Sequence, residues 1–319
     1  MTTVTETKKV YLRVGHHYLK TIGMYAALGG RSFGWPVDVA WNSQGRLYVA
    51  NRPAFLPRIT ILNFDEDYFG EFGGPRDGDG KIGAPAAVAI DRSDAIYVSD
   101  QLNHCIINYD PEGKFIARWG VYGSGKGELK EPSGMALDDE DSLYVVDSGN
   151  NRIQKFTSDG KLLLSWGAPG DGPSQFNIPH GVYVDSEGRV CVADRQNSRI
   201  QIFSSQGEFL DQWKEVWWPN SLCQDIQQNF YVAEIGGIFM FGHEARLEKP
   251  AARMTVRSPD GTIVSEWSAE DPYGKGRFFA PHSVALDSYG DIYVGEVTFS
   301  YSRHQAPSDA KVLRKYVRQ

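Results

Sequence analysis

Two histidines stand in the same short pattern, Pro-His-x-Val, and they are the first candidates for chemistry. His180 lies in PHGVYVD and His282 lies in PHSVALD, about a hundred residues further on. Imidazole titrates near neutral pH, so it can act as a general acid or base, and it is also a common metal ligand. We predict that the two side chains either hold a metal or act as acid and base. The alternative is that each imidazole only bonds water or a carboxylate in a polar channel.

An arginine is the next candidate. Arg52 directly follows the expected strand RLYVAN. An arginine in this place can clamp a substrate carboxylate through two parallel hydrogen bonds. The alternative is a surface arginine paired with a neighbouring acid. Arg195, in VADR, has the same local position in a later repeat. The segment DRQNSR also matches the general pattern of the repeat, so a structural role is the alternative for this arginine.

Glu234 and Glu296 end the expected strands FYVAE and IYVGE, where the other repeats have an aspartate or asparagine. A short polar side chain there can bond nearby backbone N–H groups and shape the following loop. We expect a glutamate to be too long for that bond. Glu234 and Glu296 are therefore candidates for a general base or a metal ligand. Ion-paired or solvated glutamates are the alternative.

Two insertions interrupt the chain directly after these glutamates, at about 235–253 and 297–310. The second insertion carries Tyr301 and His304, either of which could donate a proton if the loop reaches back over the site. A solvated loop is the alternative.

These side chains are held by a repeat that occurs six times. Each copy begins with a proline, continues through a short apolar strand and a turn, and reaches an aromatic or apolar strand that ends in a carboxylate or amide. The copies begin at Pro36, Pro85, Pro132, Pro179, Pro219 and Pro281, at intervals of 40 to 62 residues, with 47 occurring twice. Periods of this size are typical of propellers and solenoids.

One copy contains four strands. After Pro132 the chain reads GMALD, SLYVVD, RIQKF and KLLLSWG, separated by turn residues. Aromatic residues close the expected outer strands, and we expect them to pack between blades: Phe72, Trp119, Trp166, Trp213 and Trp267. Four short antiparallel strands per repeat are typical of a propeller blade. We predict one all-β domain over residues 1–319, a six-bladed β-propeller of four-stranded antiparallel blades.

The sixth copy reaches the last residue without an outer strand. The segment HHYLKTIGMYAALG, upstream of Pro36, resembles the outer-strand pattern. We predict that residues 1–35 include a strand that closes the ring, which would also cover an open sheet edge.

A propeller places equivalent residues in a ring around one axis. We call the residue after each repeat-initiating proline the ring position; in chain order it holds Val37, Ala86, Ser133, His180, Asn220 and His282. Three histidines in alternate blades could bind one metal and leave a fourth position open, as catalytic zinc requires. Here blade two has Ala86, so two imidazoles would need a carboxylate, and the candidates are Glu234, Glu296 and Asp38.

The composition of the chain disfavours some classes of binding partner. The chain has 41% hydrophobic and 13% aromatic residues and a formal net charge of −7, with no basic stripe. These features argue against a nucleic-acid partner. No run of 18 apolar residues and no apolar N-terminal segment occurs. We therefore expect no membrane partner and a cytoplasmic location.

The segments PSGMALDDEDSLYVVDSGNNRIQKF and PHGVYVDSEGRVCVADRQNSRIQIF resemble NHL repeats. The sequence is also similar to peptidyl-α-hydroxyglycine α-amidating lyase (peptidylamidoglycolate lyase). FNIPHGVYVDSEGRVCVAD and FFAPHSVALDSYGDIYVGEV resemble segments that hold zinc-binding histidines, and VANRPAF resembles the segment of its catalytic arginine. The resemblance implies ligand roles for His180 and His282 and a catalytic role for Arg52. The third zinc histidine would fall at Ala86, and the blade-three loop VVDSGNNR lacks the family's catalytic tyrosine.

We predict a lyase-like enzyme that acts on a small polar or hydroxylated carboxylate or amide at the channel mouth. A divalent metal such as zinc is the candidate cofactor. The alternatives are a metal-dependent lactone-type hydrolase and a non-catalytic NHL binding scaffold. The candidate catalytic residues are Arg52, His180, His282, Glu234, Glu296, Tyr301 and His304.

Overall fold

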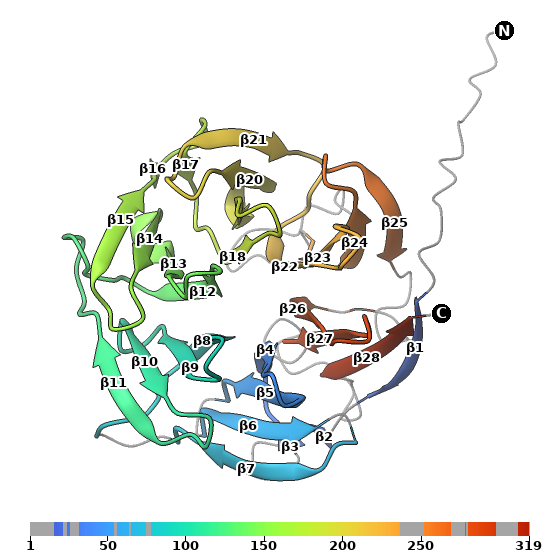
Figure 1. Ribbon diagram of the computed structural model, residues 1–319. Coiled ribbons are helices and arrows are strands. Elements are labelled where there is room, and N and C mark those ends of the chain that lie inside the picture. Colours follow the sequence, from blue (N-terminus) through green and yellow to red (C-terminus); the bar gives the residue numbers. More distant parts are fainter. Residues whose placement is uncertain are drawn as a thin grey trace, which may run out of the picture.

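The computed structural model describes residues 16–21, 24–25, 32–53, 56–63, 65–74, 78–236, 252–268, 278, 280–297 and 312–318. Within these ranges, six four-stranded antiparallel sheets are arranged around a central axis (Figure 1). The predicted six-bladed all-β propeller is confirmed. No helix in the described ranges is long and apolar enough to cross a membrane.

Each blade runs from an inner strand at the axis to an outer strand at the rim. Blade one contains β4 (Pro36–Trp41), β5 (Arg46–Asn51), β6 (Arg58–Asn63) and β7 (Tyr68–Phe72). Blade two contains β8 (Pro85–Ile90), β9 (Ile96–Asp100), β10 (Cys105–Tyr109) and β11 (Phe115–Trp119). Blade three contains β12 (Pro132–Leu137), β13 (Leu143–Asp147), β14 (Arg152–Phe156) and β15 (Leu162–Trp166).

The second half of the ring repeats this order. Blade four contains β18 (Gly181–Val184), β19 (Val190–Asp194), β20 (Arg199–Phe203) and β21 (Phe209–Trp213). Blade five contains β22 (Pro219–Gln224), β23 (Phe230–Glu234), β24 (Arg253–Arg257) and β25 (Ile263–Ser268). Blade six contains β26 (Pro281–Leu286), β27 (Ile292–Glu296), β28 (Leu313–Arg318) and β1 (His16–Thr21). Four short strands lie between the blades: β2 (Met24–Tyr25), β3 (Ser32–Phe33), β16 (Ala168–Pro169) and β17 (Gln175–Phe176). Two short 3₁₀ helices follow the second strands of blades three and four: η1 (Ser148–Asn150) and η2 (Arg195–Asn197).

The ring is closed by the strand that lies nearest the N-terminus. β1 pairs antiparallel with β28, with His16 opposite Arg318 and Thr21 opposite Arg314. Strands from the two ends of the chain therefore lie side by side (Figure 1). The predicted closing strand is confirmed, and it covers an edge of blade six that would otherwise expose unpaired backbone groups.

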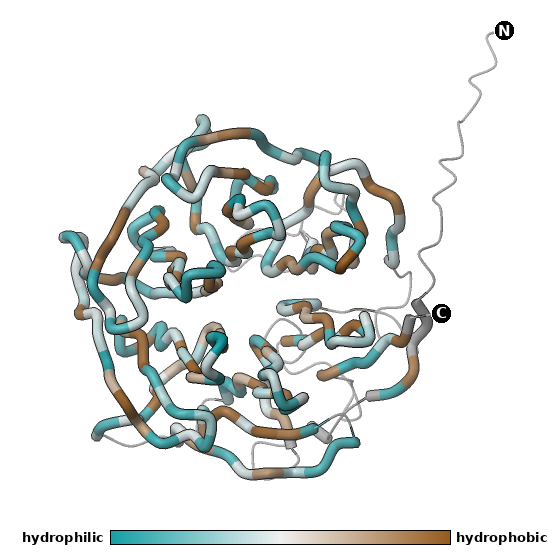
Figure 2. The backbone as a smooth tube through the Cα atoms, viewed as in Figure 1, coloured by the Kyte–Doolittle hydropathy of each residue, from teal (hydrophilic) through white to brown (hydrophobic). Residues whose placement is uncertain are grey.

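The blades pack through their middle strands and their outer aromatics. Every residue of the middle strand β13 is buried, whereas exposure alternates along the outer strand β15. Apolar segments recur in every blade between polar turns (Figure 2). Trp166, at the end of β15, packs against Gly207 of the next blade, whose φ is +79°. A Cβ at this glycine would lie 2.8 Å from the indole, so the aromatic and the turn fit only with glycine.

Six equivalent turns hold the inner strands in one orientation. Each turn begins with an asparagine or aspartate whose Oδ1 accepts the N–H of the residue four positions later: Asn42, Asp91, Asp138, Asp185, Asp225 and Asp287. These side chains bond their own turn, as short polar residues commonly do. Because every inner strand runs from its proline to one of these turns, the ring positions all meet at the opposite mouth of the channel.

Candidate functional site

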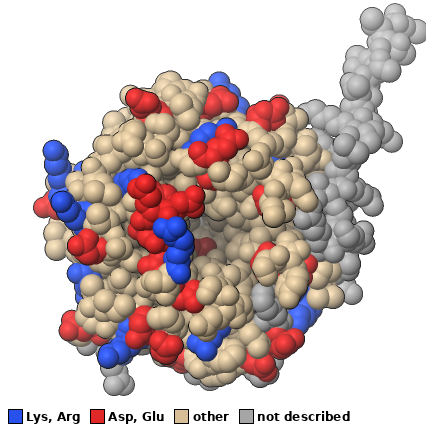
Figure 3. Space-filling model, viewed as in Figure 1, with Lys and Arg blue, Asp and Glu red and all other residues tan. Residues whose placement is uncertain are grey.

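The two histidines of the Pro-His-x-Val pattern meet at the channel. Their ring centroids are 4.7 Å apart and the rings are nearly perpendicular, at 83°. Both side chains line a central cavity of about 290 Å³, whose walls are the six inner strands. The space-filling view shows the hollow at the centre of one face, with acidic side chains along part of its rim (Figure 3). The expectation that the fold brings His180 and His282 together is confirmed.

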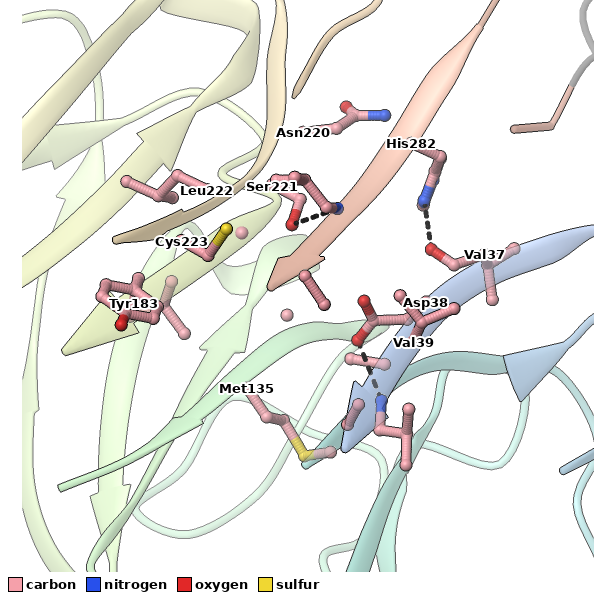
Figure 4. Close-up of a pocket in the computed structure, with 18 of the residues that line it drawn as sticks. Val37, Asp38, Val39, Met135, Tyr183, Asn220, Ser221, Leu222, Cys223 and His282 are labelled. Carbon is pink, nitrogen blue, oxygen red and sulfur yellow. Dashed lines mark hydrogen bonds between the residues drawn. The ribbon is translucent and has the colours of Figure 1, made fainter. Parts of the chain in front are cut away.

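Backbone carbonyls hold both rings in one tautomer. The Nδ1 of His282 lies 2.7 Å from the carbonyl oxygen of Val37 (Figure 4), and the Nδ1 of His180 lies 3.3 Å from that of Asn220. A carbonyl oxygen only accepts, so in each neutral imidazole the proton is on Nδ1. The Nε2 lone pair of each ring is then available to accept a proton.

Burial keeps both imidazoles uncharged. For His282, burial lowers the pKa to about 3; the hydrogen bond to Val37 opposes this, and the charges of Arg195 and Arg52 lower it further. For His180, burial again is the main cause of a pKa well below the usual range, followed by the charges of Arg195, His282 and Arg52. At neutral pH both rings are therefore uncharged.

Arg52 and Arg195 supply positive charge at this mouth. Arg52 follows β5, and its backbone N–H bonds the carbonyl of Trp35 at 3.0 Å. Arg195 begins η2 directly after β19, which gives it the equivalent place in blade four. Both guanidinium groups act on the pKa of both histidines. An anionic group bound beside the imidazoles would lie in the field of two arginines.

The expectation that a glutamate is too long for the bond at the end of the second strand is wrong for Glu234. Its Oε2 accepts the backbone N–H of Trp217 at 2.7 Å and pairs with Arg253 Nε at 2.8 Å. Its Oε1 accepts from the hydroxyl of Thr255 at 2.6 Å. Glu234 is fully buried. Aspartates of the third and fourth blades make the same pair of bonds, a backbone N–H and an arginine: Asp147 with Lys130 and Arg152, and Asp194 with Asn177 and Arg199.

Glu296 follows the same pattern in blade six. Its Oε2 accepts the N–H of Ala280 at 3.2 Å and its Oε1 pairs with Arg314. It is fully buried, and neither it nor Glu234 is among the residues that line the cavity. Both side chains are thus held in the blade framework, where they take the place of the short aspartates. Tyr301 and His304 lie outside the described residues.

Two polar residues of the cavity wall were not leading candidates in the sequence. Asp38, beside the ring position of blade one, accepts the N–H of Val88 at 3.0 Å, and burial raises its pKa to about 7. Asn220 holds the ring position of blade five between the two histidines and is 1% exposed. Among the described residues its side-chain nitrogen and oxygen have no hydrogen-bond partner. The sequence already named Asp38 as a possible metal ligand, and the ring position placed Asn220 at the channel, but neither residue was a leading candidate.

The described residues do not fit a catalytic zinc site. Such a site uses three protein ligands and one open position. Within the described part of the chain, no group of three or more His, Cys, Asp or Glu side chains is placed to hold a metal ion. Ala86, at the ring position of blade two, offers no ligand atom.

Comparisons with known proteins agree with the fold. The NHL repeat family matches residues 129–156 and 176–203, which span blades three and four. No curated protein matches the sequence. Among solved structures, a streptogramin B lyase is 14% identical, with a TM-score of 0.61 over 95% of this chain and 88% of that chain.

Two further structures are similar to the same extent. A catalytically inactive His-to-Ala variant of virginiamycin B lyase from Staphylococcus aureus, with quinupristin, is 14% identical, with a TM-score of 0.61 over 89% of this chain and 94% of that chain. A protein of unknown function from Bacteroides thetaiotaomicron is 19% identical, with a TM-score of 0.64 over 96% and 77%. At these identities the likeness shows a shared propeller fold. Nothing in the comparisons points to the amidating lyase in particular.

Proposed function

We propose that this protein is a lyase that cleaves a carbon–nitrogen or carbon–oxygen bond in a small polar substrate bearing a carboxylate or amide. The main support is the pair of neutral imidazoles whose ring centroids are 4.7 Å apart in the central cavity. Uncharged histidines that line the cavity, with one available lone pair each, can act as general bases. Arg52 and Arg195 would bind the anionic end of the substrate beside them.

The proposed reaction needs no net proton from solvent. In a hydroxylated substrate, the Nε2 of one imidazole takes the proton of the hydroxyl as the carbonyl forms and the bond to the leaving nitrogen or oxygen breaks. In a substrate without that hydroxyl, the same Nε2 takes a proton from the carbon next to the one that bears the leaving oxygen, so that a C=C bond forms as the C–O bond breaks. The imidazolium then returns that proton to the leaving atom. The free His282 is a weak base because of burial and the two arginines. A bound anion would offset the arginine charges and raise its pKa when the substrate is in place.

The comparisons support lyase chemistry on this fold only by analogy. In virginiamycin B lyase, replacing one histidine by alanine gives a catalytically inactive enzyme. An amidating-lyase-like reaction without the family's zinc remains one form of our proposal, and cleavage of a cyclic depsipeptide is another. Both rest on histidine acting as the proton-transfer group.

The test is turnover of two substrates, a peptidyl-α-hydroxyglycine and quinupristin, followed by mass spectrometry of the products. We expect one of them to be cleaved, and His180→Ala or His282→Ala to lower kcat/KM by roughly 10²–10⁴, the usual contribution of a general base. Arg52→Ala should mainly raise KM. His104→Ala is the matched control, because His104 bonds the backbone N–H of Glu131 in a surface loop.

The proposal is contradicted if neither substrate is cleaved, or if both histidine variants keep wild-type activity. The first result would favour a non-catalytic binding scaffold. A loss of activity on chelator treatment, restored by added zinc, would also contradict the metal-free reaction.

A further inference from the structure

The cavity wall contains one acidic side chain among the described residues. Asp38 is partly exposed and lines the cavity, one residue beyond Val37, whose carbonyl holds His282. Its carboxyl group faces the pocket in the close-up, on the side of the cavity below His282 (Figure 4). Asp38 accepts a backbone N–H from Val88 and has no ion-pair partner among the described residues. A carboxylate in such surroundings is costly unless a cation or proton compensates its charge.

The other titratable groups of the wall do not provide that cation. Burial lowers the pKa of His180 and His282 and raises the pKa of Tyr183 and Cys223, so all four are uncharged at neutral pH. Burial also raises the pKa of Asp38 to about 7, which agrees with a carboxyl group lacking a counter-ion. Within the described part of the chain no wall residue supplies the compensating charge, so a ligand or a proton can supply it.

Charges of both signs act near the cavity. Arg52 and Arg195 act on the pKa of the histidines but are not among the residues that line the cavity, whereas Asp38 belongs to its wall, on β4. The cavity volume of about 290 Å³ is just below the range of about 300–1,000 Å³ that is usual for ligand pockets. Such a space suits one small molecule with opposite charges at its two ends.

We propose that the ligand of this cavity carries an ammonium group that pairs with Asp38, while its anionic end faces Arg52 and Arg195. The substrate class would thus be a small amino acid or amino amide. The placement of the anionic end rests on the proposed function, whereas the ammonium site rests on Asp38 alone.

A titration of the Asp38 carboxyl group tests the ammonium site without any turnover. The side-chain ¹³C signal is followed by NMR from pH 5 to 9 in sodium chloride and in an equal concentration of methylammonium chloride, and it is assigned by its absence in Asp38→Asn. We expect the midpoint, near 7 in sodium chloride, to fall by at least one unit in methylammonium. An unchanged midpoint would overturn the proposal.

A second measurement uses only the wild-type protein, in case the variant does not fold. Calorimetry at pH 8 compares δ-aminovalerate with valerate, which differ only in the ammonium group. We expect δ-aminovalerate to bind at least tenfold more tightly, a difference of about 1.4 kcal/mol. Equal affinities, or no binding of either, would overturn the ammonium site, and this result would be separate from any failure to find a lyase activity.

Discussion

At the scale of single residues, one physical cause acts in opposite directions on the groups of the cavity. Burial disfavours charge, so it lowers the pKa of His180 and His282 and raises that of Asp38. The result is a channel wall whose histidines are uncharged near pH 7, while the Asp38 carboxyl group, with a pKa of about 7, is partly ionised there. The nearby charges of Arg52 and Arg195 add to this effect on the histidines.

The effect of the arginine charges on the pKa of His282 can be measured directly. His282 has a folded-state pKa of about 3, below its usual 6.5, so the folded protein binds fewer protons than the unfolded chain between these values. This group's contribution to stability is therefore present above pH 6.5 and is lost as the pH falls toward 3. Arg195→Gln removes one repulsive charge, and we expect it to raise the pKa of His282. The loss of stability on acidification should then occur over a narrower range of pH.

NMR titration of the imidazole Cε1–H signals gives the pKa in both proteins. Arg92→Gln is the control, since Arg92 is exposed and pairs with Asp141 in a turn. An His282 pKa that is the same in wild type and Arg195→Gln would show that Arg195 does not act on the ring.

At the scale of the strand, the carboxylate that ends the second strand of several blades has a framework role. In blades three to six it pairs with an arginine at the start of the third strand: Asp147–Arg152, Asp194–Arg199, Glu234–Arg253 and Glu296–Arg314. In each of these blades it also accepts a backbone N–H from the segment that leads into the inner strand. The same side chain thus connects three parts of one blade, whether it is an aspartate or a glutamate.

This role predicts a stability defect for Glu234→Gln. The variant leaves the buried guanidinium group of Arg257 without its anion, and Arg253 keeps only its ion pair with Glu266. Breaking a buried ion pair typically costs about 3–5 kcal/mol. We expect the free energy of unfolding, measured with urea, to fall by that amount, while ligand binding by the folded protein is unchanged.

Asp147→Asn, which alters the equivalent pair in blade three, is the matched variant and should show a comparable loss. A Glu234→Gln protein of normal stability that has lost activity would instead support the role of general base.

At the scale of the whole molecule, the ring depends on the pairing of β1 with β28. Without β1, the edge of blade six would be open, and open edges invite pairing with other chains. We expect a variant that lacks residues 1–23 to have a lower thermal midpoint and to aggregate on heating, because blade six has lost its fourth strand.

A variant that lacks only residues 1–15 is the control, since it keeps all of β1. Thermal unfolding and light scattering compare the two. Equal midpoints for both truncations would show that ring closure by β1 does not contribute to stability.

The sequence by itself determined the architecture. The repeated pattern of proline, apolar strand, turn and aromatic strand depends on local alternation and turn chemistry, which are written in neighbouring residues. The same alignment placed His180 and His282 at equivalent points of different repeats. Symmetry then predicted that they meet, because equivalent residues of a closed ring face one axis.

The charge states and the partners of these side chains depend on the tertiary structure. The charge state of His282 depends on burial, on a carbonyl of blade one and on Arg195 of blade four, which are far apart in the chain. The side-chain partners of Glu234, Arg253 and Thr255, follow an insertion in the chain. The sequence therefore did not show that the glutamate reaches them. Asp38 was a possible metal ligand by sequence, and it became the candidate ammonium site only when the described wall around it proved to lack a cation. Desolvation and electrostatics depend on distances in space, and a linear pattern does not contain those distances.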